Sequence, residues 1–124
     1  MKFLMMIYVD DALLQALPED EFDTWMRGCL AHADGLRQSG CVLDSQQLEP
    51  PSTARSFRER QQRRMIIDGP FAETKEYLAG FNLIEAADMD DALRIAQQFP
   101  WARIGAIEVR PVRDMDAVRR RVGD

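Results

Sequence analysis

The opening segment of the chain is apolar at both odd and even positions. Residues 2–9 read Lys-Phe-Leu-Met-Met-Ile-Tyr-Val, with no charged residue after the lysine. Successive side chains of a strand point to opposite faces of its sheet. The pattern therefore predicts a strand covered on both faces. A chain this short has enough helices to cover only one of these two faces.

A helical stripe follows in residues 20–38. Its apolar side chains recur at the spacing of one helix face: Phe22, Trp25, Met26, Cys29, Leu30, Ala33 and Leu36. Pro18 and the acidic residues 19–21 suit the start of a helix, where the dipole favours carboxylates. Gly40 suits the left-handed residue that ends one.

The centre of the chain predicts a strand and a hairpin. Residues 41–48 can form the second strand, and the two prolines that follow cannot donate to a ladder. Residues 53–57 and 64–67 predict two short strands joined near Gln61 and Gln62.

The last third predicts a strand, a helix and a strand. Residues 80–87 favour a strand, and Asp88 is the expected N-cap of a helix, with Asp91 in the position of a weak capping box. Pro100 is expected to end this helix. Residues 105–112 alternate between apolar and polar positions, as in a strand with one covered face.

The order of elements predicts an α+β, ferredoxin-like fold. Strand, helix, strand, hairpin-like insert, strand, helix, strand is the split βαβ plan, with an antiparallel sheet and both helices on one face. We expect one domain over residues 1–113 and a tail or short helix over residues 114–124. A symmetric homodimer that stacks two sheets would cover the open apolar face.

Composition and charge narrow the choice of partners. The chain is 46% hydrophobic and 30% charged, with a net charge of −5, which argues against nucleic-acid binding. Residues 10–23 are acidic, whereas residues 55–64 and 119–121 are rich in arginine; we interpret such short runs as solvated faces. With no signal-peptide pattern and no apolar segment of about 20 residues, we expect a cytoplasmic protein without membrane contact.

Three segments are similar to a known family. Residues 68–76 read Asp-Gly-Pro-Phe-Ala-Glu-Thr-Lys-Glu, residues 80–85 read Gly-Phe-Asn-Leu-Ile-Glu, and residues 105–111 read Gly-Ala-Ile-Glu-Val-Arg-Pro. Together with the opening strand and residues 48–53, they resemble the DGPF group of the YCII-related family along essentially the whole chain.

The resemblance implies a dimeric α/β-barrel built on the ferredoxin-like fold, and it implies little about chemistry. Some relatives in the wider family are cofactor-independent enzymes that act on small aromatic or lactone-like compounds through a His–Asp pair. The DGPF group is also associated with extracytoplasmic-function sigma factors. The only histidine here is His32, and the family's catalytic histidine would fall near Cys29, so the resemblance does not place a His–Asp pair on this chain.

The motif Asp68-Gly69-Pro70-Phe71 predicts a sharp turn. Aspartate and glycine favour turns, and proline fixes φ. Asp68 either bonds neighbouring backbone N–H groups or acts as a catalytic carboxylate.

The charged residues Glu73, Lys75 and Glu76 lie just beyond this turn. They form either a solvated loop with an ordinary ion pair or a pocket rim that orients a polar substrate. Burial of Lys75 would make it a candidate base, because a lysine in an apolar setting loses its proton more easily.

Glu108 and Arg110 are two residues apart on one strand, so they share a face. If the alternate positions face the helices, these charges point at the open face. They form either a cross-strand or cross-subunit ion pair or a receptor for a ligand carboxylate.

Cys29 and His32 are neighbours on the expected helix. A thiolate–imidazole pair is chemically possible, but Cys29 also fits the apolar stripe, and with Cys41 it is expected to be a free thiol. No metal-ligand spacing and no nucleotide-binding motif is present, so we expect neither a metal nor a cofactor.

Two functions remain open at this point. The first is a homodimer that binds a small organic ligand between its sheets and the loop over residues 68–76, with possible acid–base chemistry. The second is a non-enzymatic module for ligand sensing or protein binding in sigma-factor-linked regulation. Whether the chain is an enzyme is not decided by its sequence.

Overall fold

The computed structural model describes residues 1–124 and contains a four-stranded antiparallel sheet and a separate two-stranded hairpin. The sheet order is β2–β5–β1–β6. Its strands are β1 (Lys2–Asp10), β2 (Val42–Gln47), β5 (Glu76–Glu85) and β6 (Gly105–Pro111), and the hairpin is β3 (Arg55–Arg60) with β4 (Arg63–Asp68). The prediction of a ferredoxin-like α+β fold is confirmed.

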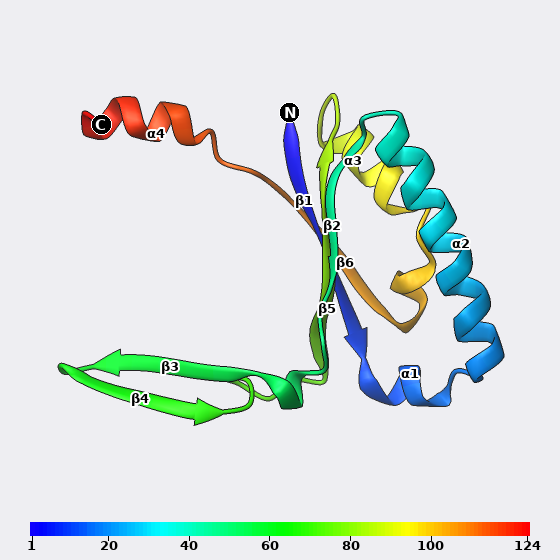
Figure 1. Cartoon of the computed structure of the whole chain (residues 1–124), viewed down its shortest axis with the longest axis horizontal. Coiled ribbons are helices and arrows are strands. Elements are labelled where there is room, and N and C mark those ends of the chain that lie inside the picture. Colours follow the sequence, from blue (N-terminus) through cyan, green and yellow to red (C-terminus); the bar gives the residue numbers. More distant parts are fainter.

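The helices of the body lie on one face of the sheet (Figure 1). They are α1 (Asp11–Ala16), α2 (Glu19–Gln38) and α3 (Met89–Ala96), with the short 3-10 turns η1 (Pro51–Thr53) and η2 (Pro100–Ile104). The hairpin and the tail helix α4 (Met115–Val122) project from the opposite side of the sheet. None of the helices combines the length and the apolar character needed to cross a bilayer.

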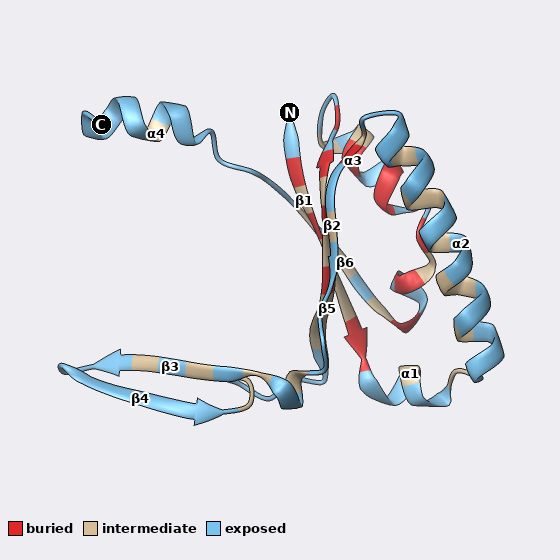
Figure 2. Cartoon of the chain, in the orientation of Figure 1, coloured by how far each residue is buried: buried red, intermediate tan, exposed pale blue.

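The core lies between the sheet, α3 and η2 (Figure 2). Phe3, Met5, Ile84 and Ile95 are its largest fully buried side chains. Although α2 is 20 residues long, none of its residues is fully buried. The longest helix therefore contacts the core only through partly buried side chains.

Two local predictions are confirmed by backbone geometry. Gln61 and Gln62 join β3 to β4 with φ values of 51° and 66°, which is the left-handed geometry of a two-residue hairpin turn. Asp88 caps α3 by accepting from the Asp91 N–H at 2.8 Å, and the Asp91 carboxylate accepts from the Ala87 N–H at 3.0 Å.

Several element boundaries differ from the sequence prediction, including that of β3, which spans Arg55–Arg60 where residues 53–57 were expected. The Asp10 carboxylate accepts two backbone N–H bonds and starts α1, a helix that the pattern did not predict. Helix α3 ends at Ala96, before Pro100 is reached, and Pro100 begins the 3-10 turn η2 instead of ending the helix. Strand β5 begins at Glu76, so this residue belongs to the sheet and not to the preceding loop.

Gly105 lies where β6 meets β1. A Cβ atom at this position would lie 1.9 Å from the carbonyl oxygen of Tyr8. Since no real contact is that short, the two strands can approach as they do only around a glycine.

Candidate ligand-binding site

A cavity of about 620 Å³ separates α2 from the sheet. This volume lies in the usual range of about 300–1,000 Å³ for small-molecule sites. Side chains of α2 form one wall, β1 and β5 form the floor, and exposed residues 46–50 form the rim. The apolar lining includes Ile7, Val9, Leu14, Phe22, Met26, Ala33, Phe99, Trp101 and Ile104.

The floor of this cavity carries an unpaired polar group. Asn82 is 4% exposed, and its side-chain oxygen has no hydrogen-bond partner. The strand register places it between Met5 of β1 and Ser45 of β2. An unsatisfied buried amide costs about 1–3 kcal/mol, so a ligand donor at this oxygen would remove a penalty that the empty protein carries.

Two ionisable groups of the lining, Tyr77 and Cys29, favour their neutral forms. Burial and, after it, the nearby Asp11 carboxylate raise the pKa of Tyr77 above its ordinary value. Burial also raises the pKa of the Cys29 thiol. Near neutral pH the cavity thus presents a phenol and a thiol, not a phenolate or a thiolate.

The Cys29–His32 pair does not form a reactive centre. Both residues border a smaller hollow of about 280 Å³ between α2 and the segment with Gln98 and Pro100, and Cys29 lines the main cavity as well. The His32 ring packs edge-on against Phe99 at 5.3 Å, and its Nε2 atom has no hydrogen-bond partner. Because burial keeps the thiol protonated, the sulfur lacks the thiolate character of a nucleophile.

Lys75 lies outside the cavity and forms an ion pair with Asp10. Its Nζ atom is 3.5 Å from the Asp10 carboxylate, which is 7% exposed, whereas the Lys75 side chain is 82% exposed. Lys75 therefore lacks the buried setting that its role as a base requires. Sequence reasoning missed Asp10 as its partner, because the contact joins the end of β1 to a loop residue distant in sequence.

The Asp68–Phe71 motif forms the base of the hairpin. The Asp68 carboxylate lies 3.2 Å from Nε of Arg55. Gly69 has φ of +95° and donates its N–H to the Ala54 carbonyl at 2.6 Å. Phe71 is exposed, and the Arg58 guanidinium lies over its ring at 5.3 Å.

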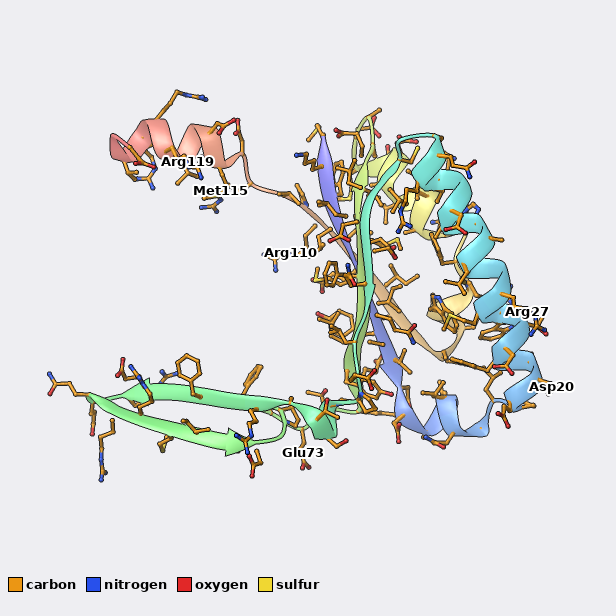
Figure 3. All side chains as sticks on the ribbon, viewed as in Figure 1. Asp20, Arg27, Glu73, Arg110, Met115 and Arg119 are labelled. Atoms are coloured by element: carbon orange, nitrogen blue, oxygen red, sulfur yellow. The ribbon has the colours of Figure 1, made fainter.

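Glu73 and Glu76 are both exposed and lie at the same end of the sheet. Glu73 lies in the loop near the base of the hairpin (Figure 3), and Glu76 faces Asp10 across the β1–β5 ladder. Neither carboxylate has an ion-pair partner.

Glu108 and Arg110 point to the face opposite the helices, where they lie on β6 beside β1. Glu108 faces Met6 and Arg110 faces Leu4, and both charged residues are exposed without an ion pair. Half-buried apolar residues fill the rest of this open face: Leu4, Met6, Tyr8, Leu78, Phe81 and Leu83. They are not part of the core on the helix side.

The structure does not bring Lys75 and Arg110 together within one chain. Arg110 lies beside Leu4, and Lys75 lies beside Asp10, six residues further along β1. At about 3.3 Å per residue, the two positions are separated by roughly 20 Å along the strand. A single pocket with both cations would need a contribution from another chain.

Comparisons with known proteins identify a family but no reaction. A family model described as the YCII-related domain matches residues 1–116. An uncharacterized protein of Rhizobium meliloti (strain 1021), R00369, is 33% identical to this chain over 114 residues, which cover 90% of this chain and 92% of that protein.

Proposed function

Since the chain belongs to the YCII-related domain family, whose shared description specifies no reaction, we propose its function from the cavity: it binds a small organic molecule between α2 and the sheet. The observation that carries the proposal is the unpaired oxygen of Asn82 in an otherwise largely apolar cavity. A binding site combines such an apolar lining with a few polar groups that fix the ligand's orientation.

The chemistry of the lining specifies the kind of molecule. An aromatic or alicyclic compound suits the rings of Phe22, Phe99 and Trp101, and a hydroxyl or N–H group on it suits the Asn82 oxygen. Asp68, Glu73 and Lys75, the candidates for acid–base catalysis, lie outside this cavity. The proposal is therefore one of ligand binding, without a catalytic step.

The decisive variant is Asn82→Leu, which keeps the size of the side chain and removes its polar atoms. We expect the empty variant to be more stable than the wild type by about 1–2 kcal/mol, because the unsatisfied oxygen is gone. We also expect it to lose the thermal stabilisation that phenolic or indolic compounds give the wild type in a thermal-shift screen.

The matched control is Arg110→Met on the open face. Ligand-induced stabilisation should survive this change if the ligand lies behind α2. Loss of stabilisation in Arg110→Met together with an unchanged response in Asn82→Leu would move the ligand to the open face and overturn the proposal. The remaining charged candidates, Glu108 on the open face and Lys75 and Glu76 at the end of the sheet, would then be mutated in turn.

We also propose that the protein works as a cytoplasmic homodimer and belongs to the DGPF group within its family. The open apolar face, which has no covering in a single chain, supports the dimer, and the motif at Asp68 supports the subgroup. Sedimentation at micromolar concentration tests the dimer. A species of 14.2 kDa under those conditions would contradict it.

The second candidate function is a protein-binding module linked to sigma factors. The exposed hairpin favours it, because arginines surround the exposed side chains of Phe57 and Ile66. This function predicts that the hairpin stays free in the purified protein and is covered only by another polypeptide.

A further inference from the structure

The β3–β4 hairpin carries exposed side chains that the rest of its own chain does not cover. Phe57 and Ile66 face each other across the ladder and are 68% and 70% exposed. A two-stranded hairpin with no packing on either face is at best marginally stable in water. A partner that covers these side chains would therefore stabilise the hairpin.

The tip of the hairpin concentrates unpaired positive charge. Arg60 and Arg63 are direct partners in the ladder, and neither has a carboxylate within ion-pair distance. Like charges directly opposite each other destabilise a strand pair. Arg55 and Arg64, in contrast, are already paired within the hairpin.

The start of α2 carries the complementary charge. Glu19, Asp20 and Glu21 form its first turn, are exposed, and have no ion-pair partner in the chain. Residues 10–23 contain six carboxylates and no lysine or arginine. Residues 55–64 contain five arginines and one glutamate, so the two segments carry opposite net charges of −6 and +4.

The hairpin cannot reach this acidic turn within its own chain. It projects from the side of the sheet opposite the helices, whereas Asp20 lies on the helix side (Figure 3). Both features nevertheless lie at the same end of the sheet, because β1 leads into α1 where β5 begins after the hairpin.

The length of the hairpin matches the distance to a second copy. Each of its strands has six residues, which extend about 20 Å at about 3.4 Å per residue. Stacked sheets lie about 10 Å apart. A hairpin that passes the end of a stacked sheet therefore extends about 10 Å further, to the level of the helices behind it.

We infer that the hairpin of each protomer docks its arginine tip on the acidic first turn of α2 in a second copy of this chain, and the reverse contact forms by symmetry. A two-fold axis between the sheets and along the strands places both hairpins at the acidic ends. The inference rests on the proposed homodimer and adds the contact that fixes its orientation.

The test reverses the charge of the hairpin tip in one variant and the charge of the first turn of α2 in another. Variant A carries Arg60→Glu and Arg63→Glu, and variant B carries Glu19→Lys and Asp20→Lys. Each variant alone opposes like charges at both contacts of its own homodimer. We expect the dissociation constant of each to rise at least tenfold in sedimentation at low salt.

Mixing the two variants restores both attractions at once, because in an A–B heterodimer each tip meets a turn of opposite charge. We expect the equimolar mixture to dimerise about as tightly as the wild type. A defect in folding cannot produce this rescue. The matched control, Asp34→Lys with Asp90→Lys, reverses exposed carboxylates at the other end of the helical layer and should leave the dissociation constant unchanged.

Each other outcome has a definite meaning. A monomeric wild type overturns the proposed dimer and this inference with it. The inference alone is overturned if the wild type dimerises and variants A and B dimerise equally tightly. It is also overturned if mixing the two variants does not restore dimerisation. In either case the hairpin would bind a different protein. If the Asp34 and Asp90 control weakens the dimer and variant B does not, the contact lies at the opposite end of the helical layer, and the inference is also overturned.

Discussion

At the scale of single residues, the fold depends on a few positions where no other side chain fits. Gly105 is the strictest of them, because the Tyr8 carbonyl occupies the space of a Cβ atom. Asn82 is different: its surroundings tolerate the side chain but do not satisfy its oxygen.

Gly105→Ala should lower the free energy of unfolding by about 2–3 kcal/mol, because the added carbon forces β6 away from β1. Urea denaturation measures the change. Gly35→Ala in α2 is the control, since a Cβ there meets nothing within 4 Å and alanine favours a helix by about 1 kcal/mol over glycine. Equal effects of the two substitutions would contradict the close strand contact.

Asp91 should make the fold sensitive to acid. The Ala87 N–H and then the Arg94 side chain hold the pKa of Asp91 below its ordinary value. Its contribution to stability is complete above the unfolded pKa of about 3.9 and is lost as the pH falls further toward the folded pKa. Asp91→Asn should therefore be less stable than the wild type at neutral pH and show a smaller loss between pH 4 and pH 2, measured by urea denaturation. Asp90 lies next to Asp91 and has no ion pair, so Asp90→Asn should lose as much stability as the wild type over this pH range.

At the scale of elements, the central observation is that α2 is separated from the sheet by the cavity. Ala33 lies on the lined side of this helix, and Ala31 lies on its exposed side. The same substitution at these two positions therefore distinguishes filling the cavity from changing the helix.

Ala33→Leu should raise the stability of the empty protein by up to about 2 kcal/mol, because its three added carbon atoms become buried at about 0.8 kcal/mol each. It should also abolish ligand-induced stabilisation in a thermal-shift assay. Ala31→Leu should do neither. A ligand response that survives Ala33→Leu would place the ligand elsewhere.

The sequence predicted those elements whose signals are local. The hairpin turn at Gln61 and Gln62 and the cap at Asp88 were found because neighbouring residues determine them. Helix α1 was missed because Asp10 continues the strand pattern up to the residue that caps the helix. Pro100 was misassigned because a proline suits the start of one helix as well as the end of another.

The candidate site was harder to predict, since it depends on contacts between distant segments. The alternation in residues 105–112 placed Glu108 and Arg110 on one face, but nothing local places Lys75 beside Asp10. The cavity had one signal that was not used: Asn82 is a polar residue at an inward position of an apolar strand. Its lack of a partner follows only from the gap beneath α2.

At the scale of the whole molecule, the hairpin and α4 project beside the two ends of the open sheet face (Figure 1). The hairpin leaves the sheet at one end, and α4 leaves it at the other. In α4, Met115 and Val122 are exposed, as Phe57 and Ile66 are in the hairpin. A second copy between these projections would cover apolar side chains on all three surfaces.

Phe81→Glu places a charge in the middle of the open face and should convert the proposed dimer to monomers, because an unpaired carboxylate in an apolar interface is strongly unfavourable. Sedimentation velocity at micromolar concentration checks this. Leu93→Glu changes an exposed leucine on the helix side and should remain dimeric. Dimers in both variants would place the interface away from the sheet.

The absence of any fully buried residue in α2 has a consequence for the life of the protein in a cell. A bound molecule would supply the packing that this helix lacks, so occupied chains would open less often than empty ones. Proteases cut chains mainly when they open. Supply of the small molecule would then set how long each copy survives, and abundance itself would report the concentration of the compound.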